Sequence, residues 1–277
     1  MNWKVVLVVG MCVAGTVRAN PFFAMDTSVR DLKELNTVKE LGYEGISWRS
    51  GPPEALAADA ENIRRHGLRM FAIFNYTPIT LDRTNLTWSE ELEADIVALK
   101  DSGTIIWLPI GSQAYPHSSP DGDAIAVPAL QRLADFAASN GVRIAIYPHT
   151  GNWAERAQDA VRLAQKVGRK NFGVTFNLCH CLMVGDEATI PEILTAASPY
   201  LFLVTINGAD SNSAHTSWDQ LIRPLDEGSY DVSRLLGKLK ELNYTGPIGL
   251  QGYGVKVPVK DNLARSIVAW RRLNEKK

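Results

Sequence analysis

Two histidines in this chain follow short apolar segments and carry a side chain suited to acid–base chemistry. His149 ends the apolar run of RIAIYPHTGNW (residues 143–153), and His180 follows the run FGVTFNL (172–178). Imidazole titrates near neutral pH, so a well-placed histidine can accept a proton from a substrate and return it. The alternative is that each histidine caps a helix or satisfies a buried carbonyl group. We expect His149 and His180 to act as acid and base.

Polar or aromatic side chains also stand at the ends of the other apolar segments. If they converge on one opening, they would form a binding site for a polar small molecule, and the aromatic rings could stack on sugar faces. The candidate stacking rings are Trp48, Tyr76, Trp153 and Tyr253. The set of segment-end residues comprises Asp26, Trp48, Arg49, Asn75, Tyr76, Tyr147, His149, Asn177, His180, Asn207, Asp210, Gln251 and Tyr253.

The segments that must position these side chains form one repeated pattern. Short runs rich in Val, Ile and Phe alternate with amphipathic stretches of helical period, which is typical of parallel βα units. The expected strands lie at residues 22–26, 43–48, 68–76, 103–112, 142–149, 172–178, 201–208 and 247–253. Eight such units predict an α/β protein that is a single (β/α)8 TIM barrel, in which the active site lies at the carboxyl ends of the strands.

Glycines and the first loop support this prediction independently. Many expected helices end in a glycine directly before the next strand, where a left-handed residue costs least as glycine. These are Gly42, Gly67, Gly103, Gly141 and Gly168. A doubly wound open sheet would usually have a glycine-rich phosphate loop after its first strand. The chain instead continues as MDTSVRD (25–31), so the barrel is favoured.

The composition limits the classes of partner. The 277 residues are 45% hydrophobic and 21% charged, and the formal net charge is -1. This balance is ordinary for a globular protein and lacks the basic excess that a nucleic-acid groove requires. We therefore expect a small-molecule sugar ligand and no nucleic-acid partner. The sequence leaves the oligomeric state open.

The first nineteen residues have the pattern of a secretory signal peptide. A short positive segment, MNWK, precedes the apolar run VVLVVGMCVAGTV, and small residues follow in VRA. The apolar run is short for a membrane span, although an uncleaved anchor is the alternative. We expect a signal peptide at 1–19, a barrel domain at 20–277, an exported protein of the periplasm or extracellular space, and no membrane association after cleavage.

Several motifs resemble one family, the xylose isomerase-like TIM barrels of the sugar-phosphate isomerase/epimerase group. VKELGYEGISW (38–48) is similar to that family's second strand, and RIAIYPHTGNW is similar to its fifth. GVTFNLCHCLMVGDE (173–187) and LNYTGPIGLQGYG (242–254) resemble the sixth and eighth strands. The resemblance covers the whole chain after residue 19 and implies carbohydrate isomerase or epimerase chemistry.

The same resemblance implies a metal site whose ligands are missing here. The family holds a divalent metal with carboxylates and a histidine at strands five to eight, and these positions fall at Tyr147, Asn177, Thr205 and Gln251. Hard divalent cations require anionic oxygen ligands, which this neutral set does not offer. Cys179 and Cys181 beside His180 lack the spacing of zinc sites. We therefore expect no cofactor, with a bound divalent metal as the alternative.

The resulting hypothesis is an exported isomerase or epimerase that removes a proton next to a sugar carbonyl at an altered metal site. His149, His180 and Asp210, the acidic residue nearest the seventh strand's end, are the expected catalytic residues. The expected substrate-binding residues are Tyr147, Asn177, Asn207, Gln251, Tyr253, Trp48, Asn75 and Lys256. Two alternatives remain: a non-catalytic sugar-binding barrel, and a lyase acting on an oxidised (keto) glycoside.

Overall fold

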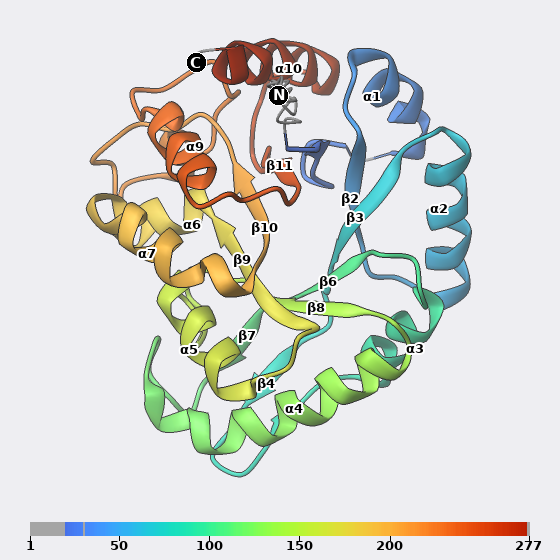
Figure 1. The fold of residues 1–277 in the computed structure, drawn as a ribbon, viewed down its shortest axis with the longest axis vertical. Coiled ribbons are helices and arrows are strands. Elements are labelled where there is room, and N and C mark those ends of the chain that lie inside the picture. Colours follow the sequence, from blue (N-terminus) through green and yellow to red (C-terminus); the bar gives the residue numbers. More distant parts are fainter. Residues whose placement is uncertain (1–19, 30, 276–277) are drawn as a thin grey trace, which may run out of the picture.

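The structure is a computed structural model that describes residues 20–29 and 31–275, so the predicted signal peptide at 1–19 lies outside the described residues. Eight parallel strands close into a barrel in the order β1-β11-β10-β9-β8-β6-β3-β2 (Figure 1). They are β1 (Phe22–Ala24), β2 (Gly45–Arg49), β3 (Arg69–Phe74), β6 (Ile105–Leu108), β8 (Arg143–Ile146), β9 (Phe172–Asn177), β10 (Leu201–Ile206) and β11 (Ile248–Leu250). The predicted (β/α)8 barrel is confirmed.

The strands are apolar on both faces because each face is covered. Phe23, Phe71, Trp107 and Leu203 come from four different strands and belong to one buried cluster, which fills the barrel interior. Their neighbours in sequence point outward; for example, the ring of Phe22 stacks on a helix residue, Trp270, at 4.3 Å between centroids. Alternation with period two thus separates an inner core from an outer one.

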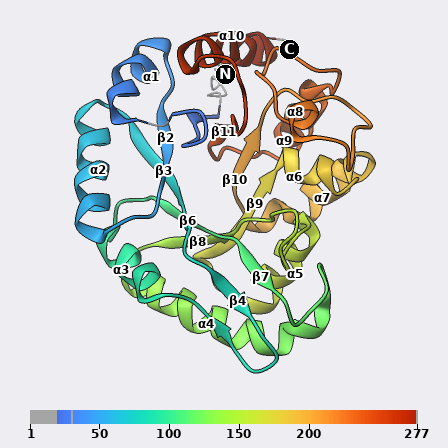
Figure 2. The same ribbon diagram turned by 180° about the vertical axis from the view of Figure 1, so that it is seen from behind.

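A ring of helices covers the outside of the barrel (Figures 1 and 2). Its members are α1 (Leu35–Leu41), α2 (Pro53–Arg65), α3 (Glu90–Ala98), α4 (Asp123–Ser139), α5 (Ala157–Val167), α7 (Ile190–Ala197), α9 (Val232–Glu241) and α10 (Val259–Glu275). The five predicted helix-ending glycines all have positive φ, between 63° at Gly168 and 96° at Gly42. Among the described residues, no helix is both long enough and apolar enough to cross a bilayer.

One predicted strand is divided in the structure. Residues 103–112 form β6 and then β7 (Ile110–Ser112), with Pro109 between them. Proline has no N–H to continue the ladder, so the chain leaves the barrel there. β7 pairs with β4 (Ile79–Leu81), which pairs with β5 (Leu86–Thr87), and this small sheet follows the ends of β3 and β6. Figure 2 shows β4 and β7 side by side near α4.

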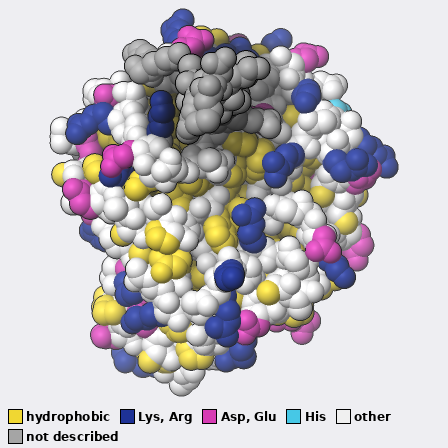
Figure 3. All heavy atoms as spheres, in the orientation of Figure 1, with side chains coloured by type: hydrophobic (Ala, Val, Ile, Leu, Met, Phe, Trp, Pro, Cys, Tyr) yellow, Lys and Arg dark blue, Asp and Glu magenta, His cyan; other side chains and the backbone are white. Residues whose placement is uncertain are grey.

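Two short helices complete the opening of the barrel. α6 (Leu178–Met183) begins directly at the end of β9, and α8 (Trp218–Leu221) follows β10 after a polar loop. The two helices contact one another, and each supplies a side chain to the site described below. Single 3-10 turns occur at η1 (Leu32–Glu34), η2 (Pro120–Gly122), η3 (Glu187–Thr189) and η4 (Ser198–Tyr200). On the face drawn in Figure 3, apolar side chains are exposed near the centre among Lys and Arg side chains, and most Asp and Glu side chains lie toward the edge.

Candidate active site

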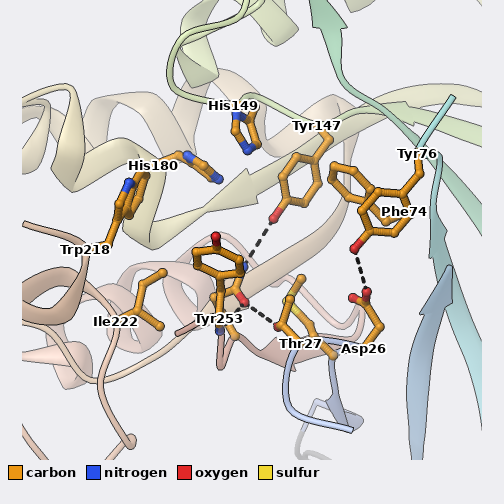
Figure 4. Close-up of a pocket in the computed structure, with 12 residues that line it drawn as sticks. Asp26, Thr27, Phe74, Tyr76, Tyr147, His149, His180, Trp218, Ile222 and Tyr253 are labelled. Atoms are coloured by element: carbon orange, nitrogen blue, oxygen red, sulfur yellow. Dashed lines mark hydrogen bonds between the residues drawn. The ribbon is translucent and has the colours of Figure 1, made fainter. Parts of the chain in front are cut away.

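A cavity of about 250 Å³ opens at the carboxyl ends of the barrel strands, where the fold predicts a site. Segments that follow β1, β3, β8, β9, β10 and β11 all contribute side chains to it (Figure 4). The cavity is lined by Met25, Asp26, Thr27, Phe74, Tyr76, Tyr147, His149, His180, Trp218, Ile222, Gln251 and Tyr253. Four of the predicted site residues, Tyr147, His149, His180 and Gln251, are therefore brought together, with Tyr253 at the rim.

The two histidines lie against each other on one wall of the cavity. Their ring centroids are 4.2 Å apart, and Figure 4 shows both rings at the cavity. Thr150 connects them: its carbonyl oxygen lies 2.9 Å from His149 Nδ1, and its backbone N–H donates to His180 Nδ1 at 3.2 Å. The Thr150 hydroxyl is also 3.1 Å from His180 Nδ1. One residue therefore orients both imidazoles.

These hydrogen bonds assign opposite tautomers to the neutral rings. A carbonyl only accepts, so His149 must carry its proton on Nδ1, which leaves a lone pair on Nε2. A backbone N–H only donates, so His180 Nδ1 must accept, and its proton lies on Nε2. In the described part of the chain, neither Nε2 atom has a hydrogen-bond partner. The pair thus presents one acceptor and one donor.

Burial keeps both histidines uncharged. Desolvation lowers the pKa of His149 from its ordinary value of 6.5, although the hydrogen bond to Thr150 opposes this. Desolvation, followed by repulsion from His149, lowers the pKa of His180 well below 6.5. Both imidazoles are therefore neutral at pH 7, and His149 Nε2 is free to accept a proton.

Three of the four residues predicted to stand at the family's metal-ligand positions, Tyr147, Asn177 and Gln251, form a neutral hydrogen-bonded cluster below the histidines. The Tyr147 hydroxyl accepts a short hydrogen bond from Asn177 Nδ2 and a longer one, 3.5 Å, from Gln251 Nε2. Gln251 Oε1 accepts from the Thr27 hydroxyl at 2.5 Å and from its neighbour's N–H, that of Gly252, at 2.9 Å. Complete burial raises the pKa of Tyr147 well above 10, so the phenol stays protonated.

This cluster does not suit a hard divalent cation. Tyr147, Asn177 and Gln251 bring no negative charge, and Thr205, the fourth position, is a buried threonine on β10 whose hydroxyl has no hydrogen-bond partner in the described structure. No group of three or more His, Cys, Asp or Glu side chains among the described residues is placed to hold a metal ion. The donor set lacks the anionic oxygens that would offset dehydration of such an ion.

A carboxyl group that the sequence analysis placed at a strand end, but gave no role, lies in the cavity. Asp26 follows β1, is only 4% exposed, and accepts from the Tyr76 hydroxyl at 3.1 Å and from Ser47 Oγ at 3.4 Å. Desolvation raises its pKa above 3.8, and hydrogen bonds from Tyr76 together with the charge of Arg49 oppose that shift. Asp26 is the one carboxyl among the residues that line this cavity.

Barrel order puts Asp26 opposite the histidines. In the closed ring of eight strands, β1 and β8 are separated by three strands in either direction, so their ends face one another across the opening. His149 follows β8 and Asp26 follows β1. Figure 4 agrees, since the Asp26 carboxyl and the histidine rings stand on different sides of the cavity. A ligand in the cavity therefore lies between these groups.

Asp210, predicted as the catalytic carboxylate, is outside the cavity, and this prediction is wrong in position. Its Oδ2 pairs with Arg223 Nη2 at 2.7 Å, and its Oδ1 accepts from the Ser229 N–H at 3.2 Å. The loop after β10 turns the side chain toward these partners because they satisfy a charge that would otherwise be half-buried and unpaired. Lys256, predicted to bind substrate, is exposed and does not line the cavity either.

Three other predicted residues point elsewhere. Trp48 faces α2, where its Nε1 donates to Asp59 at 2.8 Å. Trp153 is fully buried and donates to the Ser119 carbonyl oxygen at 2.9 Å. Asn207 donates to the Leu221 carbonyl oxygen at 2.6 Å, so it anchors α8 instead of reaching a ligand.

Asn75 has an intermediate position. Its amide is hydrogen-bonded to Thr77, and the residue lines a neighbouring pocket rather than this cavity. Asn177 lies beneath the cavity and reaches it through Tyr147.

Six of the residues that build the site were not predicted from the sequence: Met25, Thr27, Phe74, Thr150, Trp218 and Ile222. Trp218 makes an edge contact with His180 at 5.1 Å between ring centroids. A bulky aromatic residue within a long polar loop after the seventh strand was the available signal. Thr150 had no comparable signal, because its role comes from backbone groups that every residue possesses.

Comparisons with known proteins found relatives of this chain. Over 172 residues the chain is 25% identical to L-ribulose 3-epimerase of Methylomonas sp. (strain DH-1), which covers 61% of this chain and 55% of that protein. The chain spans about half the length of the curated relatives it matches.

Two solved structures share the fold at low identity. The IOLI protein, solved with a zinc atom, superposes with a TM-score of 0.71 at 17% identity and covers 92% of this chain and 98% of its own. The 3-keto-D-glucoside 4-epimerase of E. coli gives 0.69 at 18% identity, over 91% of this chain and 99% of its own. The model of the xylose isomerase-like TIM barrel family matches residues 35–273, and this protein belongs to that family.

Proposed function

We propose that this protein is a sugar isomerase or epimerase that removes a proton from the carbon next to a carbonyl group. The observation that carries the proposal is the pair of neutral histidines with opposite tautomers at the barrel mouth. Its similarity to L-ribulose 3-epimerase supports the same class of reaction. The family positions for metal ligands are neutral here, so we propose that the chain's own acid–base groups perform the proton transfers.

His149 is the proposed base. Its Nε2 lone pair is available because the Nδ1 proton is committed to the Thr150 carbonyl oxygen. His180 is the proposed electrophile, since its Nε2–H can donate to the carbonyl oxygen as negative charge develops there. A neutral imidazole is suited to that role when burial prevents its protonation. Together the two rings would stabilise an enediolate.

Asp26 is the proposed partner on the other face. Epimerisation requires that the proton leaves one face of the carbon and returns to the opposite face. Asp26 lies across the barrel from His149, and desolvation raises its pKa, which favours the protonated form that could deliver a proton. Isomerisation would need proton transfer on the histidine side of the cavity only. A requirement for Asp26 would therefore distinguish epimerisation from isomerisation.

The lining favours an uncharged sugar. Among the twelve residues that line the cavity there is no Lys or Arg, so a sugar phosphate would meet no cationic side chain. Tyr253 is 60% exposed at the rim, and Trp218 stands over His180; both rings are available to cover apolar faces of a sugar. Tyr147 and Gln251 provide neutral hydrogen-bonding groups below them.

Two other functions use the same site. A lyase acting on a keto-glycoside begins with the same proton removal and then expels the group on the neighbouring carbon. A sugar-binding barrel without catalysis is the second alternative. It would account for the neutral character of Tyr147, Asn177 and Gln251, which are already hydrogen-bonded to one another. Both are outcomes of the following experiment.

The test is solvent proton exchange. The protein, dialysed against EDTA and analysed for metals, is incubated in D2O with L-ribulose, D-allulose, D-fructose and a 3-keto-glucoside, and proton NMR follows the C–H signal next to the carbonyl. We expect that signal to disappear from at least one sugar, with an epimer or isomer appearing. An enone product would indicate the lyase. Thermal stabilisation by a sugar without any exchange would overturn the proposal in favour of binding alone.

We also propose that the protein is exported. The pattern of residues 1–19 supports this, and the two cysteines of the mature chain, Cys179 and Cys181, are buried and unpaired, so the fold does not depend on an oxidising or reducing compartment. Amino-terminal sequencing of the protein recovered from cell fractions should give a chain that begins near Asn20. A cytoplasmic protein that retains Met1 or Asn2 would contradict the proposal.

A further inference from the structure

A second pocket adjoins the cavity described above. Its volume is about 290 Å³, against about 250 Å³ for the first, and the two share Phe74, Tyr76 and His149 as lining residues. Sites for drug-sized ligands usually occupy about 300 to 1,000 Å³. The first cavity falls below that range, whereas the two pockets together fall within it. The two pockets have lining residues in common, and their combined volume suits a molecule larger than one sugar ring.

The second pocket is built by the small sheet outside the barrel. Ile79 and Thr80 of β4 and Gly111 of β7 line it, together with prolines that precede each of these strands. Asn152, from the segment after His149, closes the other side. The division of the predicted strand at Pro109 therefore creates this pocket, because β7 leaves the barrel and pairs with β4.

Its chemistry matches a neutral sugar ring. The lining combines Tyr76, two prolines and Ile79 as apolar surface with Asn75, Thr80 and Asn152 as hydrogen-bonding groups. No Asp, Glu, Lys or Arg is among the residues that line it. An uncharged hexose presents the same mixture of apolar faces and hydroxyl groups, whereas a uronic acid or a phosphate would leave its charge unpaired.

The residues that line both pockets indicate where a glycosidic bond between two sugar rings would lie. Tyr76 packs against Phe74 at 4.8 Å between ring centroids, and its hydroxyl is held by Asp26 at 3.1 Å. Its ring therefore stands where the pockets meet. His149, the proposed base, borders both. A sugar whose reacting carbon lies beside His149 would therefore lie next to the second pocket.

We infer that the substrate is a neutral two-ring glycoside, with the carbonyl-bearing ring in the first cavity and the glycosidically linked ring in the second pocket. The inference rests on the proposed function, because that function places the carbonyl ring beside His149. The second ring contributes binding energy and takes no part in proton transfer.

Gly111 allows the second pocket to be filled selectively. A Cβ added there would meet only Asn152 Oδ1 and Ile79 O, both at 3.9 Å, and the backbone of Gly111 is not in the left-handed region. Leucine should therefore fit without strain and occupy pocket volume. Gly237 on α9 is a matched control, since it is exposed and an added Cβ would meet nothing within 4 Å.

Calorimetry on the wild type, Gly111→Leu and Gly237→Leu measures binding of D-fructose and of two keto-disaccharides, lactulose and palatinose. We expect a disaccharide to bind wild type at least about tenfold more tightly than D-fructose. Gly111→Leu should remove that gain and leave D-fructose binding unchanged, and Gly237→Leu should behave as wild type. Asn152→Ala, which leaves the backbone intact, should reduce the gain about threefold.

Disaccharides that bind no better than D-fructose would overturn the inference, as would a Gly111→Leu variant that weakens D-fructose equally. These measurements need no turnover. If sugars show no proton exchange but the disaccharide gain is present and sensitive to Gly111→Leu, the proposed reaction fails while the two-ring site stands. If exchange occurs but the gain is absent, the two-ring site fails and the reaction stands.

Discussion

The two sides of the barrel mouth hold their titratable side chains in place with different groups. On the histidine side, Thr150 holds His149 and His180 through three contacts, mostly from its backbone. On the Asp26 side, a carboxyl is held by side chains, Tyr76 and Ser47. Desolvation is the largest cause of the pKa shift on both sides, and it acts in opposite directions: it lowers the pKa of the histidines and raises that of Asp26.

Burial acts on both sides of the cavity in a way that suits proton transfer to and from an uncharged ligand. Burial disfavours the charged form of every group, so it favours unprotonated imidazoles on one side and a protonated carboxyl on the other. A site that favours neutral groups suits an uncharged sugar, and we propose that a proton moves when a substrate carbon lies between the two sides. Variants of each side test this difference.

The largest effect is expected from the histidine side. His149→Gln keeps a hydrogen-bonding side chain but removes the base, and should reduce solvent exchange into the substrate about 10³-fold or more, since general base catalysis contributes roughly 10² to 10⁴. His180→Gln should have a similar effect through the developing oxyanion. The measurement is the rate of deuterium incorporation by NMR. The matched control is His66→Gln at the end of α2, whose ring is bonded to the Asn62 carbonyl oxygen. Equal rates for His149→Gln and His66→Gln would refute the role of His149.

The Asp26 side should give a smaller and different effect. Asp26→Asn preserves the contact with Tyr76 but cannot deliver a proton, so epimer formation should fall about a hundredfold while exchange from the His149 side continues. Chromatography of the sugars measures epimer, and NMR measures exchange on the same samples. Asp210→Asn is the control, because that carboxylate pairs with Arg223 outside the cavity. Should Asp210→Asn abolish epimerisation and Asp26→Asn leave it intact, the assignment of the carboxyl would be reversed.

Thr150 connects the two rings, and a conservative change there should have a moderate effect. Thr150→Val removes the hydroxyl that lies 3.1 Å from His180 Nδ1 but keeps both backbone groups, and should lower kcat/KM about tenfold. The hydroxyl favours the neutral ring, so its loss should raise the pKa of His180.

The pH profile distinguishes positioning from simple destabilisation. Because both histidine pKa values are lowered below 6.5, wild-type kcat/KM should stay high at pH 6.5 and fall only at lower pH as the rings protonate. In Thr150→Val that acid limb should move to higher pH, and Thr150→Ser should restore it. An unchanged limb in Thr150→Val would show that its hydroxyl does not tune His180.

The smallest expected effect is on stability. It tests whether the pKa of a carboxyl group is also raised by burial outside the cavity. Asp95 on α3 is fully buried, and neither of its carboxyl oxygens has a hydrogen-bond partner in the described structure. Desolvation, assisted by Glu91, raises its pKa to about 7. The unfolded chain loses this proton near pH 4, so the folding free energy contributed by the protonated group declines as pH rises from about 4 to about 7.

Asp95→Asn removes this titration. At pH 8 the variant should be more stable than wild type by on the order of 1 kcal/mol, and the difference should shrink toward pH 4, as measured by urea unfolding at each pH. The control is Asp123→Asn, which breaks an ion pair with Arg162 at 3.0 Å and should destabilise the protein at pH 8. A difference between Asp95→Asn and wild type that is independent of pH would contradict the raised pKa.

Strand positions were well predicted, and side-chain directions at the strand ends were predicted only in part. Ser47 and Trp48 are neighbours on β2, and both are near its end. Ser47 faces inward and donates to Asp26, so Trp48 must face outward to α2. The sequence predicted the strand but not which of these two adjacent residues faces inward. Tyr147 and His149 after β8 were both predicted to face the barrel opening. Both line the cavity, because residues two positions apart point to the same side of an extended segment.

Residues beyond the strand ends were harder to place. Asp210 lies four residues past the end of β10, in a loop whose course depends on Arg223 and Ser229 from the following segment. Asp26 lies two residues past β1 and is held by the barrel itself. Distance from the last paired residue therefore explains why the carboxyl that lines the cavity is the one nearer to its strand.

The sequence by itself determined the closed parallel barrel, the glycine helix ends and the neutral character of Tyr147, Asn177, Thr205 and Gln251, because period, composition and residue type are local properties. Only the tertiary structure decided which carboxyl enters the cavity, which tautomer each histidine adopts and how a split strand opens a second pocket. These features depend on contacts between segments far apart in the chain. Their hydrogen-bond partners and burial exist only after the barrel has closed.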